Sequence, residues 1–283
     1  MKSFVLRFCS LFLLSALFFR VSTAQSDSLP LQSKMRADLP AFVPILADPY
    51  EPRNGVSNDF RNNHVELFAG KSAELIRWQR VVMRSAAGIE FFTWSLLRRE
   101  PNFRFPVEAV DYFFGAFLST QMKTREGKFS ARLRLSHISA HLVDGAFSTG
   151  ITPRVFSREF LSFAGASELS KFKLSLGATF LFHTIPDTIG RFQAELGTQL
   201  GGINNRGLYT SAWMNLQMIK RWEPTVIFKG GYLLPCFSAG EDSTLASSSI
   251  EFFVEYYYGI SRYGQLFPHH ETRLSAGIVF QGW

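Results

Sequence analysis

Long apolar runs and cysteine pairs are both missing from this chain. Beyond residue 24 no stretch of about 18 consecutive apolar residues occurs, so we expect no transmembrane helix. Of the two cysteines, Cys9 lies in the N-terminal segment described next and Cys236 stands alone, which excludes an intrachain disulfide once that segment is removed. Clusters of basic residues are missing as well, and their absence argues against nucleic acid as a partner.

The first 24 residues have the pattern of a secretory signal peptide. Lys2 and Arg7 precede the apolar run Leu11–Phe19, and small residues end the segment at Ala24, where we expect cleavage. The alternative is an uncleaved helix. The segment carries three basic residues and no acidic one, so its removal lowers the formal charge from +7 to +4 (7 − 3). That mild charge is compatible with anionic lipid but does not demonstrate it.

Residues 25–62 are rich in proline and show no regular alternation. The stretch ADPYEPR from Ala47 to Arg53 contains two prolines, each of which pushes the preceding residue towards extended geometry. We therefore expect an extended N-terminal arm, with a terminus of no fixed structure as the alternative.

From residue 63 to residue 283, segments of about ten residues alternate between apolar and polar side chains. In one of them Leu176 belongs to the apolar face and Ser175 to the polar face. A soluble protein would have to bury the 30 phenylalanines, whereas a transmembrane barrel can turn them to lipid. The pattern predicts an all-β protein, a transmembrane antiparallel up-and-down β-barrel of about 12 strands; a soluble β-sandwich is the rival fold. The expected strands cover residues 63–70, 75–83, 88–97, 109–122, 127–142, 155–165, 171–183, 191–201, 208–218, 225–234, 249–258 and 273–281.

The polar faces of these segments mix both signs of charge. A narrow barrel can pair such charges across its lumen, so we expect a filled interior, which disfavours a small-solute channel. The chain ends on Trp283, and a terminal aromatic residue is typical of outer-membrane assembly signals. We therefore expect the cell outer membrane as location, with membrane lipid and the outer-membrane assembly machinery as partners. The charged residues are Arg132, Arg134, Lys171, Lys173, Arg191, Lys229 and Arg273 against Asp111, Glu195, Glu251 and Glu255.

Four stretches resemble a bacterial family known as domain of unknown function 1207 (DUF1207). They are Pro44–Arg53, Arg132–Asp144, Ser157–Glu159 and Tyr263–Gln265. The resemblance spans most of the chain beyond the signal peptide and implies an outer-membrane β-barrel of the Gram-negative envelope. It implies no activity, because none is attached to the family.

The segment GKFSARLRLSHISAHL, residues 127–142, departs from the other strands in one respect. Its odd positions are apolar from Phe129 to Leu135, and then the polar residues His137, Ser139 and His141 continue on the same face. Polar groups at the end of an oily face suit a strand that leaves lipid at the membrane–water boundary.

The triplet His137-Ile138-Ser139 resembles the His-x-Ser of outer-membrane phospholipase A and of the lipid A deacylase. In those families a strand carries both residues on its lipid-facing side, and a residue about a dozen positions later orients the histidine. Ile151 stands at that position here. A hairpin that pairs residues whose numbers sum to 296 would instead place Glu159 opposite His137 while matching the apolar sets. The candidate catalytic residues are therefore Ser139 as nucleophile, His137 as base and Glu159 as the residue that orients it.

Three functions remain open on the sequence. The first is an outer-membrane barrel of unknown specific activity with a structural or interaction role, in which His137, Ser139 and Glu159 are polar rim residues. The second is a lipid acyl hydrolase, and the third is a small-solute channel. A metal site at His137 and His141 would need the chain to turn between them, since an extended strand separates them by about 13 Å. The sequence leaves cofactors, oligomeric state and calcium dependence open.

Overall fold

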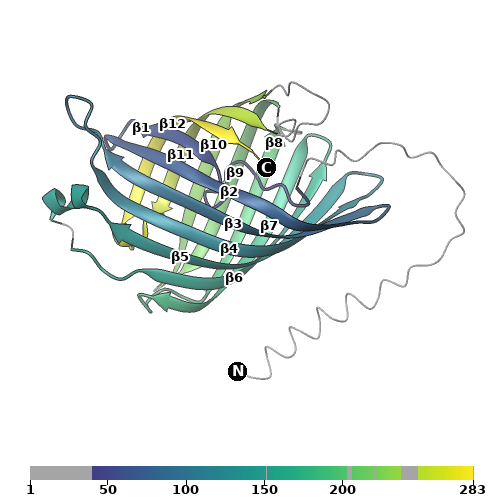
Figure 1. Ribbon diagram of the computed structural model, residues 1–283, viewed down its shortest axis with the longest axis horizontal. Coiled ribbons are helices and arrows are strands. Elements are labelled where there is room, and N and C mark those ends of the chain that lie inside the picture. The colour runs from purple at the N-terminus through teal and green to yellow at the C-terminus, as the bar shows by residue number, and fades with distance from the viewer. Residues whose placement is uncertain (1–39, 151, 203–205, 220, 237–247, 283) are drawn as a thin grey trace, which may run out of the picture. The chain divides into compact units, whose positions relative to one another are not determined.

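The computed structural model describes residues 40–150, 152–202, 206–219, 221–236 and 248–282, and Figure 1 shows their arrangement. The expected signal peptide, residues 1–24, and the terminal Trp283 lie outside these ranges. In the described ranges no helix has both the length and the apolar character needed to cross a membrane.

Twelve antiparallel strands form one closed barrel, because the first strand pairs with the last as well as with the second. Each of the other strands pairs with its neighbours in sequence, which is the up-and-down order predicted from the alternation. Strong tilt of the strands is visible in Figure 1. The strands are β1 (Asn54–Asp59), β2 (His64–Gln79), β3 (Met83–Arg98), β4 (Val107–Lys123), β5 (Lys128–Leu142), β6 (Ser157–Leu169), β7 (Phe172–Ile185), β8 (Phe192–Gly201), β9 (Gly207–Met218), β10 (Trp222–Pro235), β11 (Ser249–Ile260) and β12 (His270–Gln281).

The predicted strand number is confirmed, although two of its members were misplaced. Residues 63–70 and 75–83 were expected to form two strands, but both belong mainly to the single strand β2. The missing member is β1, which lies within residues 25–62, where we expected an arm. The barrel therefore begins at Asn54 rather than at residue 63, and the arm ends before it.

The alternation places apolar side chains outside and polar ones inside. Leu176 of β7 is 58% exposed on the outer face, whereas its neighbour Ser175 points inward and is partly covered. In β5 the outward set Phe129, Leu133 and Leu135 is exposed, and the alternate residues are buried in the lumen. A continuous apolar outer surface of this kind is a poor surface for water and a good one for lipid.

The lumen is filled along much of its length by residues 40–53. Glu51 makes ion pairs with Arg132 and with Arg134, at 2.8 Å for the latter, and all three side chains are buried. Lys173 and Lys229 donate to backbone carbonyl groups of the same segment. The arm expected on the sequence is thus a luminal plug, and the expectation of a filled interior is met by the chain itself.

A second segment, residues 261–269 between β11 and β12, closes the mouth of the barrel at which β5 ends. The Tyr263 hydroxyl donates to Glu66, the Gly264 amide donates to Asp111, and the Gln265 side chain donates to the carbonyl of Ala140. Burial, and after it the Glu66 carboxylate, raises the pKa of Tyr263 well above its usual value. The hydroxyl therefore keeps the proton that it donates.

The expected luminal charge pairing is confirmed for some residues and wrong for others. Lys229 pairs with Glu251 at 2.7 Å, and Arg273 pairs with Glu66. Lys171 and Arg191 are instead exposed, because they precede β7 and β8 at turns and do not lie on a luminal face.

Candidate functional site

The paired strands β5 and β6 bring the three candidate residues to one patch of the outer face. Their register joins Leu135 to Leu161, His137 to Glu159 and Ser139 to Ser157, so paired numbers sum to 296 as expected. His137, Ser139 and Glu159 are each partly exposed, whereas the intervening Ile138 is buried on the luminal side. The strand pairing thus places these side chains on the face that carries the apolar belt.

Glu159 is the centre of this patch. One of its oxygens, Oε1, lies 2.8 Å from His137 Nδ1 and accepts a second hydrogen bond of 2.8 Å from the Ser157 hydroxyl. The other oxygen, Oε2, is bonded to His183 Nδ1 of β7. Glu159 therefore holds donors from its own strand and from both neighbouring strands.

The contact between Glu159 and His137 has a chemical consequence. A carboxylate that binds the Nδ1–H of an imidazole fixes the tautomer whose Nε2 carries a lone pair, and it stabilises the imidazolium that forms when Nε2 takes a proton. Ser139 stands two residues from His137 on the same face, about 6.5 Å along the strand. Within the described part of the chain the Ser139 hydroxyl makes no hydrogen bond, to His137 or to any other group.

His183 was not among the residues selected from the sequence, since strict alternation assigns it to the lumen. In β7 the odd-numbered Lys173, Thr179 and Leu181 are buried inside the barrel. A β-bulge then interrupts the pairing, because Phe160 faces Leu181 while Glu159 faces His183. The extra residue turns His183 outward, and its side chain is 57% exposed beside Glu159. No sequence pattern marked this bulge.

His141 does not join the patch. Strand β5 runs without a turn to Leu142, so His141 stays extended away from His137, and its ring lies 5.8 Å from that of Tyr112. The two-histidine metal arrangement required a turn at this point. Over the described ranges the structure contains no group of three or more His, Cys, Asp or Glu residues that could hold a metal ion.

A shallow apolar groove on the outer face leads to His137 and Glu159. It crosses from β2 to β7 and has a volume of about 700 Å³, within the range of about 300–1,000 Å³ typical of small-molecule sites. The small side chain of Ala116 lies at the base of the groove. Ala116 pairs with Ile89 of β3 on one side and with Leu135 of β5 on the other. The other apolar side chains of the lining are Ala73, Phe91, Phe114 and Phe182.

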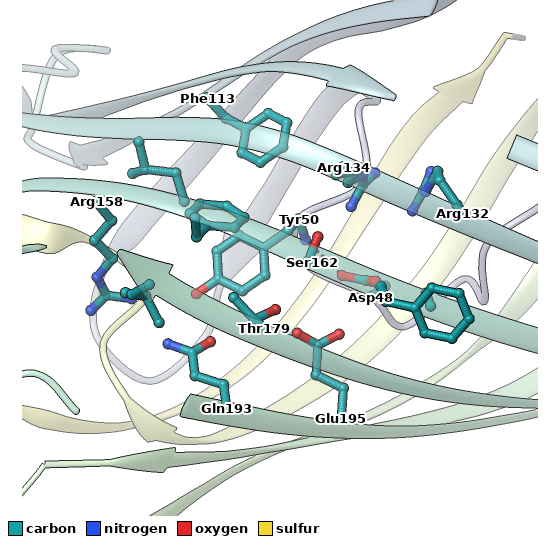
Figure 2. A pocket seen from close by; sticks show the side chains of 15 residues that line it. Asp48, Tyr50, Phe113, Arg132, Arg134, Arg158, Ser162, Thr179, Gln193 and Glu195 are labelled. Carbon is teal, nitrogen blue, oxygen red and sulfur yellow. Dashed lines mark hydrogen bonds between the residues drawn. The ribbon is translucent and has the colours of Figure 1, made fainter. Parts of the chain in front are cut away.

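A second, polar pocket lies in the lumen between the arm and strands β4 to β8 (Figure 2). Figure 2 shows Asp48 and Tyr50 of the arm among side chains that the strands direct inward. The space, about 50 Å³, suits a few water molecules at about 10–15 Å³ each. The labelled strand residues are Phe113, Arg132, Arg134, Arg158, Ser162, Thr179, Gln193 and Glu195.

Comparison with known proteins identifies the fold. No protein-family model matches the chain, and no curated protein sequence matches it. Outer membrane phospholipase A from Escherichia coli is similar in structure, with a TM-score of 0.55 and 12% identity over 83% of this chain and 93% of that chain. The Salmonella typhi outer membrane phospholipase dimer with bound calcium gives a TM-score of 0.56 and 12% identity over 83% and 94%. At such low identity the likeness shows the barrel fold alone.

Proposed function

We propose that this protein is an outer-membrane lipid acyl hydrolase, with Ser139 as nucleophile, His137 as general base and Glu159 as the residue that orients His137. The observation that carries the proposal is the 2.8 Å contact between His137 Nδ1 and Glu159, on the same outer face as Ser139. Serine is a weak nucleophile until a positioned base removes its proton, and this contact supplies the positioning.

The substrate class follows from where these side chains lie. The outer face is apolar over most of its surface, which supports insertion in a membrane, and the expected signal peptide supports the outer membrane. The apolar groove that reaches His137 and Glu159 offers room for an acyl chain. The structurally similar proteins are named as phospholipases, and the proposal extends that substrate class to this chain. We also propose that the protein is related to the DUF1207 family.

Each half of the reaction needs two proton transfers by His137. Its Nε2 takes the proton of the Ser139 hydroxyl as Oγ attacks the ester carbonyl carbon. The bond between that carbon and the alcohol oxygen then breaks, and the alcohol leaves with the proton from Nε2. In the second half, Nε2 takes a proton from a water molecule as the water oxygen attacks the acyl carbon. The bond between that carbon and Ser139 Oγ breaks, Nε2 returns the proton to Oγ, and the fatty acid leaves.

Two other functions are less well supported. A small-solute channel conflicts with residues 40–53, which fill the lumen and are fixed there by Glu51, Lys173 and Lys229. A structural or interaction barrel, in which the patch is only a polar rim, is the outcome that the experiment below separates from the hydrolase.

The test is release of fatty acid from phospholipid or lipid A by purified protein in detergent, with and without calcium. Ser139→Ala and His137→Ala should each lower the rate by several orders of magnitude, because a nucleophile and its base act as a unit. Glu159→Gln should lower it less, since an amide still orients the imidazole but does not stabilise its charge.

Ser130→Ala is the matched control, because Ser130 lies on the same strand but faces the lumen and does not line the groove. It should leave the rate unchanged. Absence of hydrolysis by the wild type on both lipids would support the structural barrel instead. Full activity in Ser139→Ala would show that the nucleophile is another residue.

A further inference from the structure

His183 takes part in the same patch, although the alternation of its own strand directs it to the lumen. From Phe172 to Leu181 the odd-numbered residues of β7 point inward, and the bulge at Phe182 reverses this for His183. A bulge leaves one residue without its ladder partner and re-aims the side chains that follow. Its effect here is to place the imidazole opposite Glu159, where paired residues share a face.

The contact made by His183 complements those made by the other donors. His137 and Ser157 both bind Oε1 of Glu159, and His183 binds Oε2. The last torsion of a glutamate side chain is broad, so a carboxylate bound at one oxygen can still rotate. Donors at both oxygens remove that freedom and keep Oε1 directed at His137 Nδ1.

We propose that His183 is a positioning residue, which fixes the Glu159 carboxylate by its Nδ1–H and through it the tautomer and orientation of His137. The inference rests on the proposed function, since the positioned base is the one that activates Ser139. His183 transfers no proton in the reaction and touches no reacting atom. Its role is to restrict Glu159 to the side-chain conformation in which Oε1 is directed at His137.

A neutral hydrogen-bond donor to Oε2 of Glu159 is sufficient for this role. The proposal can therefore be tested by restoring such a donor at position 183. Asparagine places its amide nitrogen close to the position of histidine Nδ1 and can donate to Oε2. His183→Ala should therefore lower kcat by about 10- to 100-fold, since small misplacements in a catalytic array have effects of that size. KM should stay within about twofold of the wild-type value. His183→Asn should restore most of the lost kcat.

His141→Ala is the matched control. It removes the same residue type from the same outer face, but the His141 ring lies against Tyr112 and not against Glu159. Its kcat should equal that of the wild type. A structural effect of removing an outward histidine would appear in both variants, whereas loss of positioning appears in His183→Ala alone.

A second measurement does not depend on hydrolysis. In protein labelled with nitrogen-15 at histidine and held in detergent micelles, His137 should show a single Nδ1–H tautomer with slow proton exchange. His183→Ala should mix the tautomers and speed exchange at least several-fold, while His141→Ala leaves both unchanged. If wild-type protein hydrolyses no lipid but His183→Ala has this effect, the proposed function fails and the positioning role stands.

Two results would overturn the proposal itself. One is an unchanged His137 signal in His183→Ala, whether or not lipid is hydrolysed. The other is a loss of kcat in His183→Ala that His183→Asn does not restore, because a donor to Oε2 would then not be what the position requires.

Discussion

Replacement of Glu51 by alanine should loosen the luminal plug and destabilise the barrel. Glu51 is 5% exposed and pairs with two buried guanidinium groups. Arg134 keeps a second partner, Glu90, at 2.8 Å. Arg132 has its ion pairs with Glu51 alone among the described residues, so the substitution leaves one buried charge uncompensated. Removing one partner of a buried pair costs about 3–5 kcal/mol, and we expect a loss of that size in the free energy of unfolding.

The measurement is reversible unfolding of the barrel in lipid vesicles, followed by tryptophan fluorescence. Trp94 and Trp213 report on the plug directly, because their rings lie 5.9 and 6.1 Å from the ring of Tyr50. Conductance across a planar bilayer should rise from a closed baseline if the plug leaves the lumen. The matched control is Glu223→Ala, which breaks the pairs with the exposed Arg221 and with His270 and should change stability little, because surface ion pairs contribute little. A loss for Glu51→Ala no larger than that of the control, without added conductance, would contradict the plug.

Two further predictions concern the outer face. Leu176→Arg should destabilise the barrel by about 2–4 kcal/mol if the residue lies near the bilayer midplane, whereas Ser175→Arg should be milder because its side chain enters the lumen; equal losses in vesicle unfolding would count against the assigned faces. Ala116→Phe should fill the floor of the groove and shift hydrolysis towards short acyl chains by about tenfold. Ala178→Phe, also on the exposed outer face but outside the groove lining, should keep the wild-type preference in a chain-length series.

The faces of most strands were accessible from the sequence because the side-chain period of a strand is two. The number of twelve agrees with the structure because the division of β2 into two expected strands offset the missing β1. The register of β5 on β6 was accessible for the same reason, since a shift by one residue would have set the outward Leu135 against Phe160 or Ser162, which belong to the luminal face. The first strand was not accessible. Its sequence NGVSND has only 6 residues and is mostly polar. It forms a strand because the backbones of β12 and β2 pair with it on both sides.

The luminal position of residues 40–53 could be predicted from the sequence only in part. The prolines indicated an extended segment, and the charges on the strand faces indicated that the lumen is filled. Glu51, one acidic residue in an irregular stretch, links the segment to the luminal charges. It pairs with Arg132, which is 81 positions further along the chain, and with Arg134. Contacts of that sequence separation leave no local pattern, so composition and periodicity do not reveal them.

The contacts around Glu159 are the observation that favours the proposed catalytic site over an ordinary polar rim. Rim side chains where a strand leaves lipid can bind water, and they need neither a fixed partner nor a bulge. Here three donors converge on one carboxylate, and the bulge at Phe182 supplies one of them. Ser139 lies on the same face as these partners, with a hydroxyl that makes no hydrogen bond within the described chain. In a polar rim the serines on this face would have equivalent surroundings. The proposed hydrolase instead requires the hydroxyl of Ser139, beside His137, to be available for reaction.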